Sequence, residues 1–157
     1  MKPRIWILLL ACWVGTTITA ESAQCSSCLA GTVSAAGAAS CTTCPAGYSS
    51  PAGVEICSLC AAGTYSAAGS ARCTTCLAGT VSVAGAASCT TCPAGYPSPA
   101  GVEICSFCAA GTYSAAGSTS CTTCLAGTVS AAGEASCTIC PAGYSSPAGV
   151  ETCTPTG

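Results

Sequence analysis

The sequence predicts a small disulfide-rich repeat protein, an elongated rod of tandem 16-residue units with short strands and turns, little regular secondary structure and an N-terminal signal helix. Cysteine accounts for 18 of the 157 residues, and its spacing is constant from Cys25 onward. Large apolar side chains are scarce, because Leu, Ile, Val and Phe together supply only 15 of the 137 residues after Ala20. So few of these residues cannot bury a conventional hydrophobic core. We therefore expect cross-links to stabilise the fold.

Residues 1–20 have the pattern of a secretory signal peptide. Lys2 and Arg4 precede a ten-residue apolar stretch that ends at Val14, and small and polar residues then lead to Ala20, the expected cleavage point. A membrane anchor is the alternative, but this stretch is short of the roughly 20 apolar residues that span a bilayer. We expect a secreted, extracellular protein with a short leader at 21–24 and no membrane span in the mature chain.

Eight tandem Cys-x2-Cys-x12 repeats fill residues 25–153, and a tail follows at 154–157. Each x12 segment carries Ala-Gly twice with a Ser between them, so that Gly occupies two fixed positions per repeat. Three loop variants alternate and give a slower period of 48 residues. This self-similarity predicts a linear array in which each repeat contacts only its neighbours.

The fixed glycines also predict the local conformation. Each Gly costs about 1 kcal/mol inside a helix, so we expect no helix after the signal. Ser50-Pro51-Ala52-Gly53 has the residue preferences of a type I turn, and Cys44-Pro45-Ala46-Gly47 repeats them. Short extended pieces such as Thr64-Tyr65-Ser66 are expected to join the turns.

Composition argues against several functional classes. His, Asp and Asn are absent, and after Ala20 the only basic residue is Arg72, against five Glu, for a formal charge of −4. Such a chain offers no basic surface for nucleic acid or anionic lipid. After Ala20 it also lacks the His or Lys that a conventional hydrolase or redox enzyme uses as a base. We predict no catalytic residue, no enzyme activity and no cofactor.

Three pairing schemes compete for the cysteines. Bridges within each Cys-x2-Cys would close strained rings, and a crossed scheme would join Cys25 to Cys41 and Cys28 to Cys44. We favour bridges across each x12 segment, because every repeat then closes itself in a loop worth about 3 kcal/mol. These pairs are Cys28–Cys41, Cys44–Cys57, Cys60–Cys73, Cys76–Cys89, Cys92–Cys105, Cys108–Cys121, Cys124–Cys137 and Cys140–Cys153. This scheme leaves Cys25 as an unpaired thiol that could join two chains in a dimer.

Metal and redox chemistry are the alternatives to structural bridges. The spacing Cys-x2-Cys-x12-Cys-x2-Cys is close to a four-thiolate zinc pattern, but each such site would carry a charge of about −2, with one Arg to offset several sites. A thioredoxin-like role needs a helix that lowers the pKa of a thiol, and the sequence predicts none. We expect no bound metal.

The segment from Cys60 to Cys76, with Cys-Ala-Ala-Gly-Thr-Tyr-Ser at its start, resembles the ephrin-receptor-like cysteine-rich repeat. It is also similar to the module of tumour-necrosis-factor receptors, and the likeness covers about residues 25–153. The resemblance implies an extracellular, rod-like, disulfide-bonded array that serves as a spacer or a recognition surface. The chain departs from the motif where Val33, Val81 and Val129 replace Tyr, and charged side chains are few.

Other recurring residues receive structural interpretations first. The tyrosines are expected to pack over a disulfide and a Gly turn rather than to bind a ligand, and they are Tyr48, Tyr65, Tyr96, Tyr113 and Tyr144. Glu55, Glu103 and Glu151 are expected to be solvated rather than to bind calcium. The Thr pairs at 42–43, 74–75, 90–91 and 122–123 raise the alternative of an ice-binding face, which the intervening repeats interrupt.

These observations together predict a secreted, non-enzymatic protein with a structural, spacer or interaction-mediating role outside the cell. The expected partner is an unknown extracellular protein or matrix. The alternatives are a zinc-binding array of four-cysteine sites, a fragment of a larger receptor ectodomain and an ice-binding repeat protein.

Overall fold

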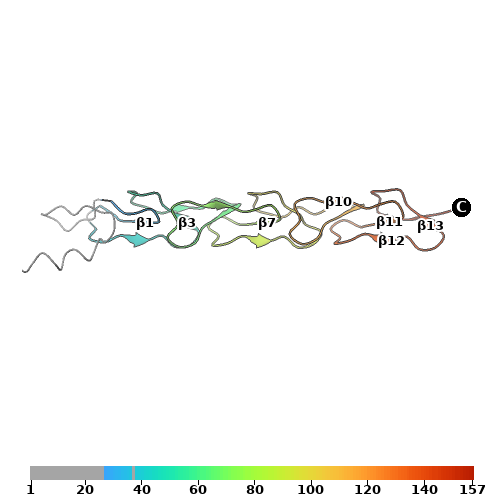
Figure 1. Ribbon diagram of the computed structural model, residues 1–157, viewed down its shortest axis with the longest axis horizontal. Helices are drawn as coiled ribbons and strands as arrows, with labels where there is room; N and C mark the ends of the chain where they lie inside the picture. Colours follow the sequence, from blue (N-terminus) through green and yellow to red (C-terminus); the bar gives the residue numbers. More distant parts are fainter. Residues whose placement is uncertain (1–26, 37) are drawn as a thin grey trace, which may run out of the picture. The chain divides into compact units, whose positions relative to one another are not determined.

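The computed structural model describes residues 27–36 and 38–157, and it confirms a small disulfide-rich repeat protein. Figure 1 shows short strands joined by loops and no helix in the coloured part of the chain. The predicted signal segment, the leader at 21–24 and Cys25 lie outside the described residues. The elongated form expected from the sequence stays a prediction. Within the described residues, no helix is both long and apolar enough to cross a membrane.

The chain divides into two compact units. The first runs to Ala61 and also includes Tyr65–Thr74 and Ala84–Ser88. The second includes Ala62–Thr64, Thr75–Val83 and Cys89–Gly157. We number the 16-residue repeats from 1 to 8, repeat 1 being residues 28–43 and repeat 8 residues 140–155. Repeats 5 to 8 therefore lie wholly in the second unit.

Seven of the eight repeats form a two-stranded antiparallel hairpin. In each hairpin a strand that follows the first Gly pairs with the two residues of the next Cys-x2-Cys, as in Tyr48↔Leu59 and Ser49↔Ser58. The hairpins are β1 (Thr32–Val33) with β2 (Thr42–Thr43), β3 (Tyr48–Ser49) with β4 (Ser58–Leu59), β5 (Thr64–Tyr65) with β6 (Thr74–Thr75), β7 (Thr80–Val81) with β8 (Thr90–Thr91), β9 (Thr112–Tyr113) with β10 (Thr122–Thr123), β11 (Thr128–Val129) with β12 (Thr138–Ile139), and β13 (Tyr144–Ser145) with β14 (Thr154–Pro155).

The turn before each first strand differs from the expected type. The Tyr48 N–H donates to the Pro45 carbonyl at 3.2 Å, so the turn is 45–48 rather than 44–47. Gly47 is the third residue of this turn and has a φ of 81°. A positive φ at the third position belongs to a type II turn, whereas a type I turn has a negative φ there. The type I prediction for this segment was therefore wrong, because the turn is shifted by one residue to use the conformational freedom of Gly.

Repeat 5 lacks the hairpin, and Pro97 explains its absence. Pro97 occupies the position of Ser49 in repeat 2 and Ser145 in repeat 8. Its carbonyl still accepts a hydrogen bond from the Ser106 N–H at 3.0 Å, but proline has no N–H to return. The pair therefore keeps one of its two ladder hydrogen bonds.

Eight disulfides each join cysteines 13 residues apart, and they are the pairs of the x12 scheme. Their Cα–Cα distances lie between 5.6 and 5.9 Å, within the usual range for disulfides. Each repeat is therefore a closed loop. Among the described cysteines none is free.

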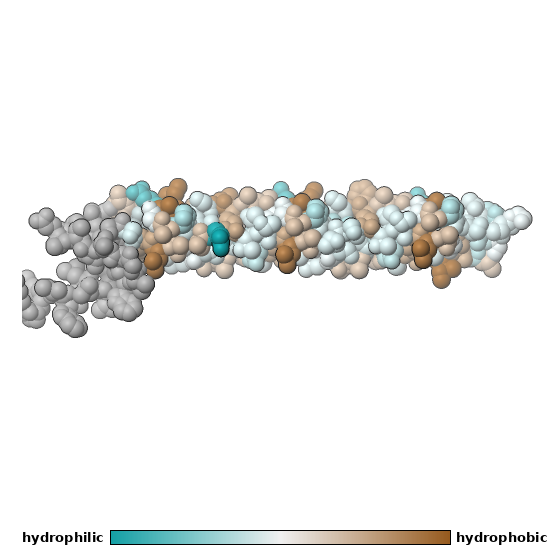
Figure 2. All heavy atoms as spheres, turned by 45° about the horizontal axis from the view of Figure 1, so that its top comes forward, coloured by the Kyte–Doolittle hydropathy of each residue, from teal (hydrophilic) through white to brown (hydrophobic). Residues whose placement is uncertain are grey.

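The interior is built from sulfur and hydroxyl groups instead of aliphatic side chains. The first cysteine of repeats 1 to 7 is at most 3% exposed, and one serine in each of repeats 2 to 8 is at most 6% exposed. The larger apolar side chains lie outside, among them Leu77, Leu125 and Ile139, each more than 75% exposed. In Figure 2 strongly apolar residues form separate patches among paler ones. The cross-links thus replace the core that the composition cannot supply.

Backbone hydrogen bonds connect successive repeats within a unit. In the second unit, the Gly95 N–H donates to the Ser114 carbonyl at 2.7 Å, and the Gly117 N–H donates to the Cys92 carbonyl at 2.9 Å. The prediction that each repeat contacts only its neighbours was wrong, because Gly95 of repeat 5 also lies against the backbone of Gly133 in repeat 7. The absence of a side chain at this Gly allows the backbones to approach so closely.

Candidate functional site

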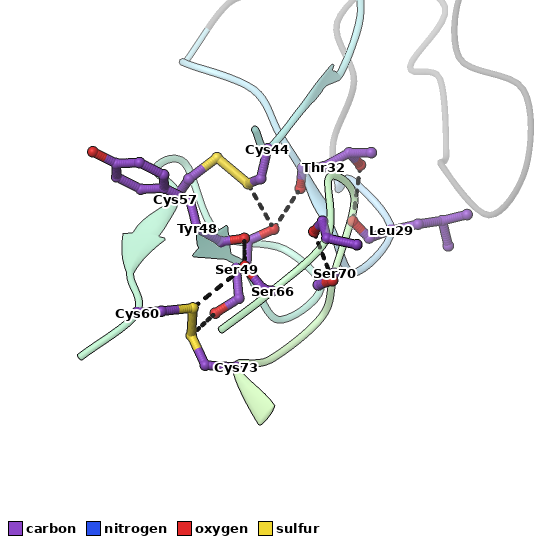
Figure 3. Close-up of a disulfide and its surroundings, with 12 residues drawn as sticks. Leu29, Thr32, Cys44, Tyr48, Ser49, Cys57, Cys60, Ser66, Ser70 and Cys73 are labelled. Atoms are coloured by element: carbon purple, nitrogen blue, oxygen red, sulfur yellow. Dashed lines mark hydrogen bonds between the residues drawn. A yellow bond between two sulfur atoms is a disulfide. The ribbon is translucent and has the colours of Figure 1, made fainter. Parts of the chain in front are cut away.

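A recurring contact between a serine and a disulfide forms the interior of the repeats. In the first unit, Ser50 Oγ lies 3.4 Å from Cys44 Sγ and donates to the Thr32 carbonyl at 3.3 Å. In the same way, Ser66 Oγ lies 3.3 Å from Cys60 Sγ and donates to the Tyr48 carbonyl at 2.9 Å. Figure 3 shows Ser66 beside Cys60 and Tyr48, together with the Cys44–Cys57 and Cys60–Cys73 disulfides. Each hydroxyl satisfies a carbonyl of the preceding repeat, so it ties two closed loops together.

Ser114 in repeat 6 is the exception. Its Oγ is buried without a hydrogen-bond partner in the described part of the chain. The matching carbonyl in the other repeats lies 18 residues earlier, which here is Tyr96, directly before Pro97. The unsatisfied hydroxyl therefore accompanies the missing hairpin of repeat 5.

The pairing of the cysteines determines what chemistry they can perform. The sixteen described cysteines are all in disulfides, so this part of the chain presents no thiolate to a zinc ion or to a redox partner. Among the described residues, no cluster of three or more His, Cys, Asp or Glu side chains could hold a metal. Glu55, Glu103 and Glu151 are exposed.

The tyrosines are less buried than the packing interpretation predicts. Tyr48, Tyr96 and Tyr144 are 36%, 40% and 47% exposed, while Tyr65 and Tyr113 are half-buried. Tyr96 does lie against a glycine turn, since its hydroxyl oxygen would be 3.4 Å from a Cβ at Gly133. That glycine is in repeat 7 and not in the adjacent loop. Each tyrosine therefore leaves part of its ring available at the surface.

The Thr pairs are exposed, and each belongs to a different two-stranded sheet. They are the strands β2 (Thr42–Thr43), β6 (Thr74–Thr75), β8 (Thr90–Thr91) and β10 (Thr122–Thr123). The methyl group of the second threonine faces a glycine 26 residues later, as Thr123 Cγ2 does at Gly149. The hydroxyl groups of these pairs thus line separate hairpins, and no single sheet among the described strands carries them all.

A groove of about 470 Å³ lies in the second unit between repeats 6 and 7. Its lining residues include Tyr113 and Leu125, which have large apolar side chains, and Thr122, Thr123, Thr128 and Ser136, which carry hydroxyl groups. The Cys124–Cys137 disulfide holds the segment that carries Leu125 and Ser136. No charged side chain is among its lining residues.

The buried serines were not predicted from the sequence. A serine follows the first cysteine of every repeat by six residues, for example Ser50 after Cys44 and Ser66 after Cys60. The constancy of this position across eight loops was the available signal, because the neighbouring positions vary.

Comparisons with known proteins identify no relative: no protein-family model matches the chain, and no curated protein is significantly similar to it.

Proposed function

We propose that this chain is a secreted, non-enzymatic structural protein that acts as a spacer or an interaction surface in the extracellular space. The single observation that supports this role most strongly is the closure of every repeat by its own disulfide. Disulfides persist in oxidising compartments and are rare in reducing ones, so a fold that depends on eight of them fits an extracellular location.

The composition of the repeats supports a structural role. The interior consists of cross-links and serine hydroxyls, and the surface carries few charges. The resemblance to ephrin-receptor-like repeats is part of the same proposal, since arrays of that kind serve as spacers and recognition surfaces outside cells.

Expression of the full chain with a C-terminal tag in a eukaryotic secretory host tests the location. We expect the protein in the medium, with an N-terminus near Glu21 and the disulfides formed. The matched control starts at Glu21 after an initiator methionine, and it should stay in the cytosol with reduced thiols. Retention of the full chain inside the cell, with free thiols and bound zinc, would contradict the proposal.

A further inference from the structure

The groove between repeats 6 and 7 combines one aromatic ring with several hydroxyl groups. Tyr113 comes from β9, where its backbone is paired with Thr122, and the residue is half-buried. Leu125 belongs to the next repeat and is 77% exposed. The groove is therefore open to solvent, and its volume of about 470 Å³ is within the usual range of ligand sites.

The hydroxyl groups of the groove are available to a ligand. The side-chain oxygens of Thr122, Thr123 and Ser136 have no hydrogen-bond partner within residues 27–36 and 38–157, and all three residues are exposed. The Thr128 hydroxyl donates to the Leu125 carbonyl at 2.8 Å, which leaves the lone pairs of its oxygen free to accept. The groove thus offers both donors and acceptors, because each hydroxyl can act in either way.

Charge narrows the ligand class further. None of the lining residues is charged, and the nearest charge along the chain is the exposed Glu134, two residues before Ser136. An anionic ligand would meet this carboxylate without a cation to offset it, and a ligand that depends on ion pairs would find none in the groove. The site therefore favours a neutral molecule that is rich in hydroxyl groups and has an apolar face.

We propose that this groove binds a neutral oligosaccharide. The Tyr113 ring would stack on the C–H face of a sugar, since the face of an aromatic ring is electron-rich and attracts polarised C–H groups. Hydroxyls of Thr122, Thr123 and Ser136 would exchange hydrogen bonds with the sugar hydroxyls, and Leu125 would cover the adjacent sugar unit of the oligosaccharide. This activity goes beyond a structural role and would attach the protein to a glycan.

The sequence repeats the same residue types 48 positions earlier. Six residues there match the six side chains of the groove one for one, and they are Tyr65, Thr74, Thr75, Leu77, Thr80 and Ser88. Nearby positions vary between the two copies, since Arg72 corresponds to Ser120 and Val83 to Ala131. The test below therefore changes both tyrosines, because the earlier set carries the same residue types in the sequence.

Titration calorimetry of the purified, oxidised full-length protein tests the proposal. The probes are cellohexaose, laminarihexaose, mannohexaose and chitohexaose as neutral ligands, and a heparin hexasaccharide as the anionic one. The double variant Tyr65→Ala/Tyr113→Ala removes both rings. The matched control Tyr48→Ala/Tyr144→Ala removes two exposed tyrosines that do not line the groove. Intact mass verifies that all variants keep their disulfides.

We expect at least one neutral hexasaccharide to bind, with affinity about tenfold weaker in the Tyr65→Ala/Tyr113→Ala variant and unchanged in the control. Binding by none of the neutral probes would overturn the proposal, and so would equal affinity in both double variants or selective binding of the heparin hexasaccharide. The measurement uses purified protein, so its failure would leave the secreted structural role untouched.

Discussion

Gly95 occupies a position where a single methyl group would collide with another repeat. It has a φ of 81°, and a Cβ there would overlap the carbonyl oxygen of Gly133. Gly127 has the same φ of 81°, but a Cβ there would have no atom within 4 Å. The two positions therefore share the cost of a left-handed backbone, and they differ in whether a Cβ would collide with the backbone of another repeat.

Comparison of Gly95→Ala with Gly127→Ala isolates the contact between repeats. The Gly127→Ala variant should lose about 1–2 kcal/mol of unfolding free energy, the cost of the left-handed conformation for a residue with a Cβ. The Gly95→Ala variant should lose at least about 3 kcal/mol, because the overlap with a backbone cannot be relieved by a rotamer change. Guanidinium unfolding of the oxidised proteins, followed by the near-UV signal of tyrosine, measures both values. Equal losses would mean that the close approach to Gly133 does not stabilise the array.

Repeat 5 shows how one residue changes a whole element. Pro97 removes a donor from the ladder, and the Ser114 hydroxyl is buried without a partner in the described residues. Repeats 2 and 8 have Ser49 and Ser145 at the same position and form complete hairpins.

Replacement of Pro97 by serine should restore the hairpin of repeat 5. We expect Pro97→Ser to form the missing pair of strands and to raise the unfolding free energy by about 1 kcal/mol, since it adds one backbone hydrogen bond. Hydrogen exchange would show protection of the new amide at position 97. The control is Pro99→Ser in the exposed turn, which should bring no gain because only the rigidity of proline is lost there. Rapid exchange at position 97 together with lower stability would contradict this explanation of the missing hairpin.

The repeats, turns and buried serines show which parts of the structure can be predicted from the sequence. Cysteine spacing fixes the loop length, so the repeat architecture followed from it. The absence of helices in the described residues followed from the two fixed glycines of each repeat. The turn at Gly47 was assigned one residue too early, because Pro and Gly preferences fit two registers and only the backbone φ distinguishes them. The buried role of Ser66 was missed, since it depends on a carbonyl 18 residues earlier. The groove at Tyr113 could not be predicted, because it joins side chains of two repeats.

At the scale of the whole molecule, the disulfides carry the stability that a hydrophobic core supplies elsewhere. A loop of about 14 residues is worth roughly 3 kcal/mol in the chain-entropy model, and residues 28–153 contain eight such bridges between described cysteines. The exposed Leu77, Leu125 and Ile139 contribute little to burial.

Reduction should therefore unfold the protein as a whole. We expect a phosphine reductant at neutral pH to abolish amide protection in all eight repeats, because the serine hydroxyls and short hairpins cannot offset the chain entropy alone. The control is the oxidised protein, heated without reductant, and most of its amides should stay protected. Protection that survives complete reduction would show that packing rather than cross-linking maintains the fold.

The fold rests on the closure of every repeat by its own bridge, and intact mass tests this closure directly. The secreted protein is denatured without reduction, and its mass is measured with and without a thiol-alkylating reagent. Each disulfide lowers the mass by about 2 Da, so the eight bridges should lower it by about 16 Da relative to the reduced chain. We expect alkylation then to modify none of the sixteen cysteines from Cys28 to Cys153. Alkylation of those cysteines in the non-reduced protein, with stoichiometric zinc in a parallel native sample, would show instead that the repeats are not closed by disulfides.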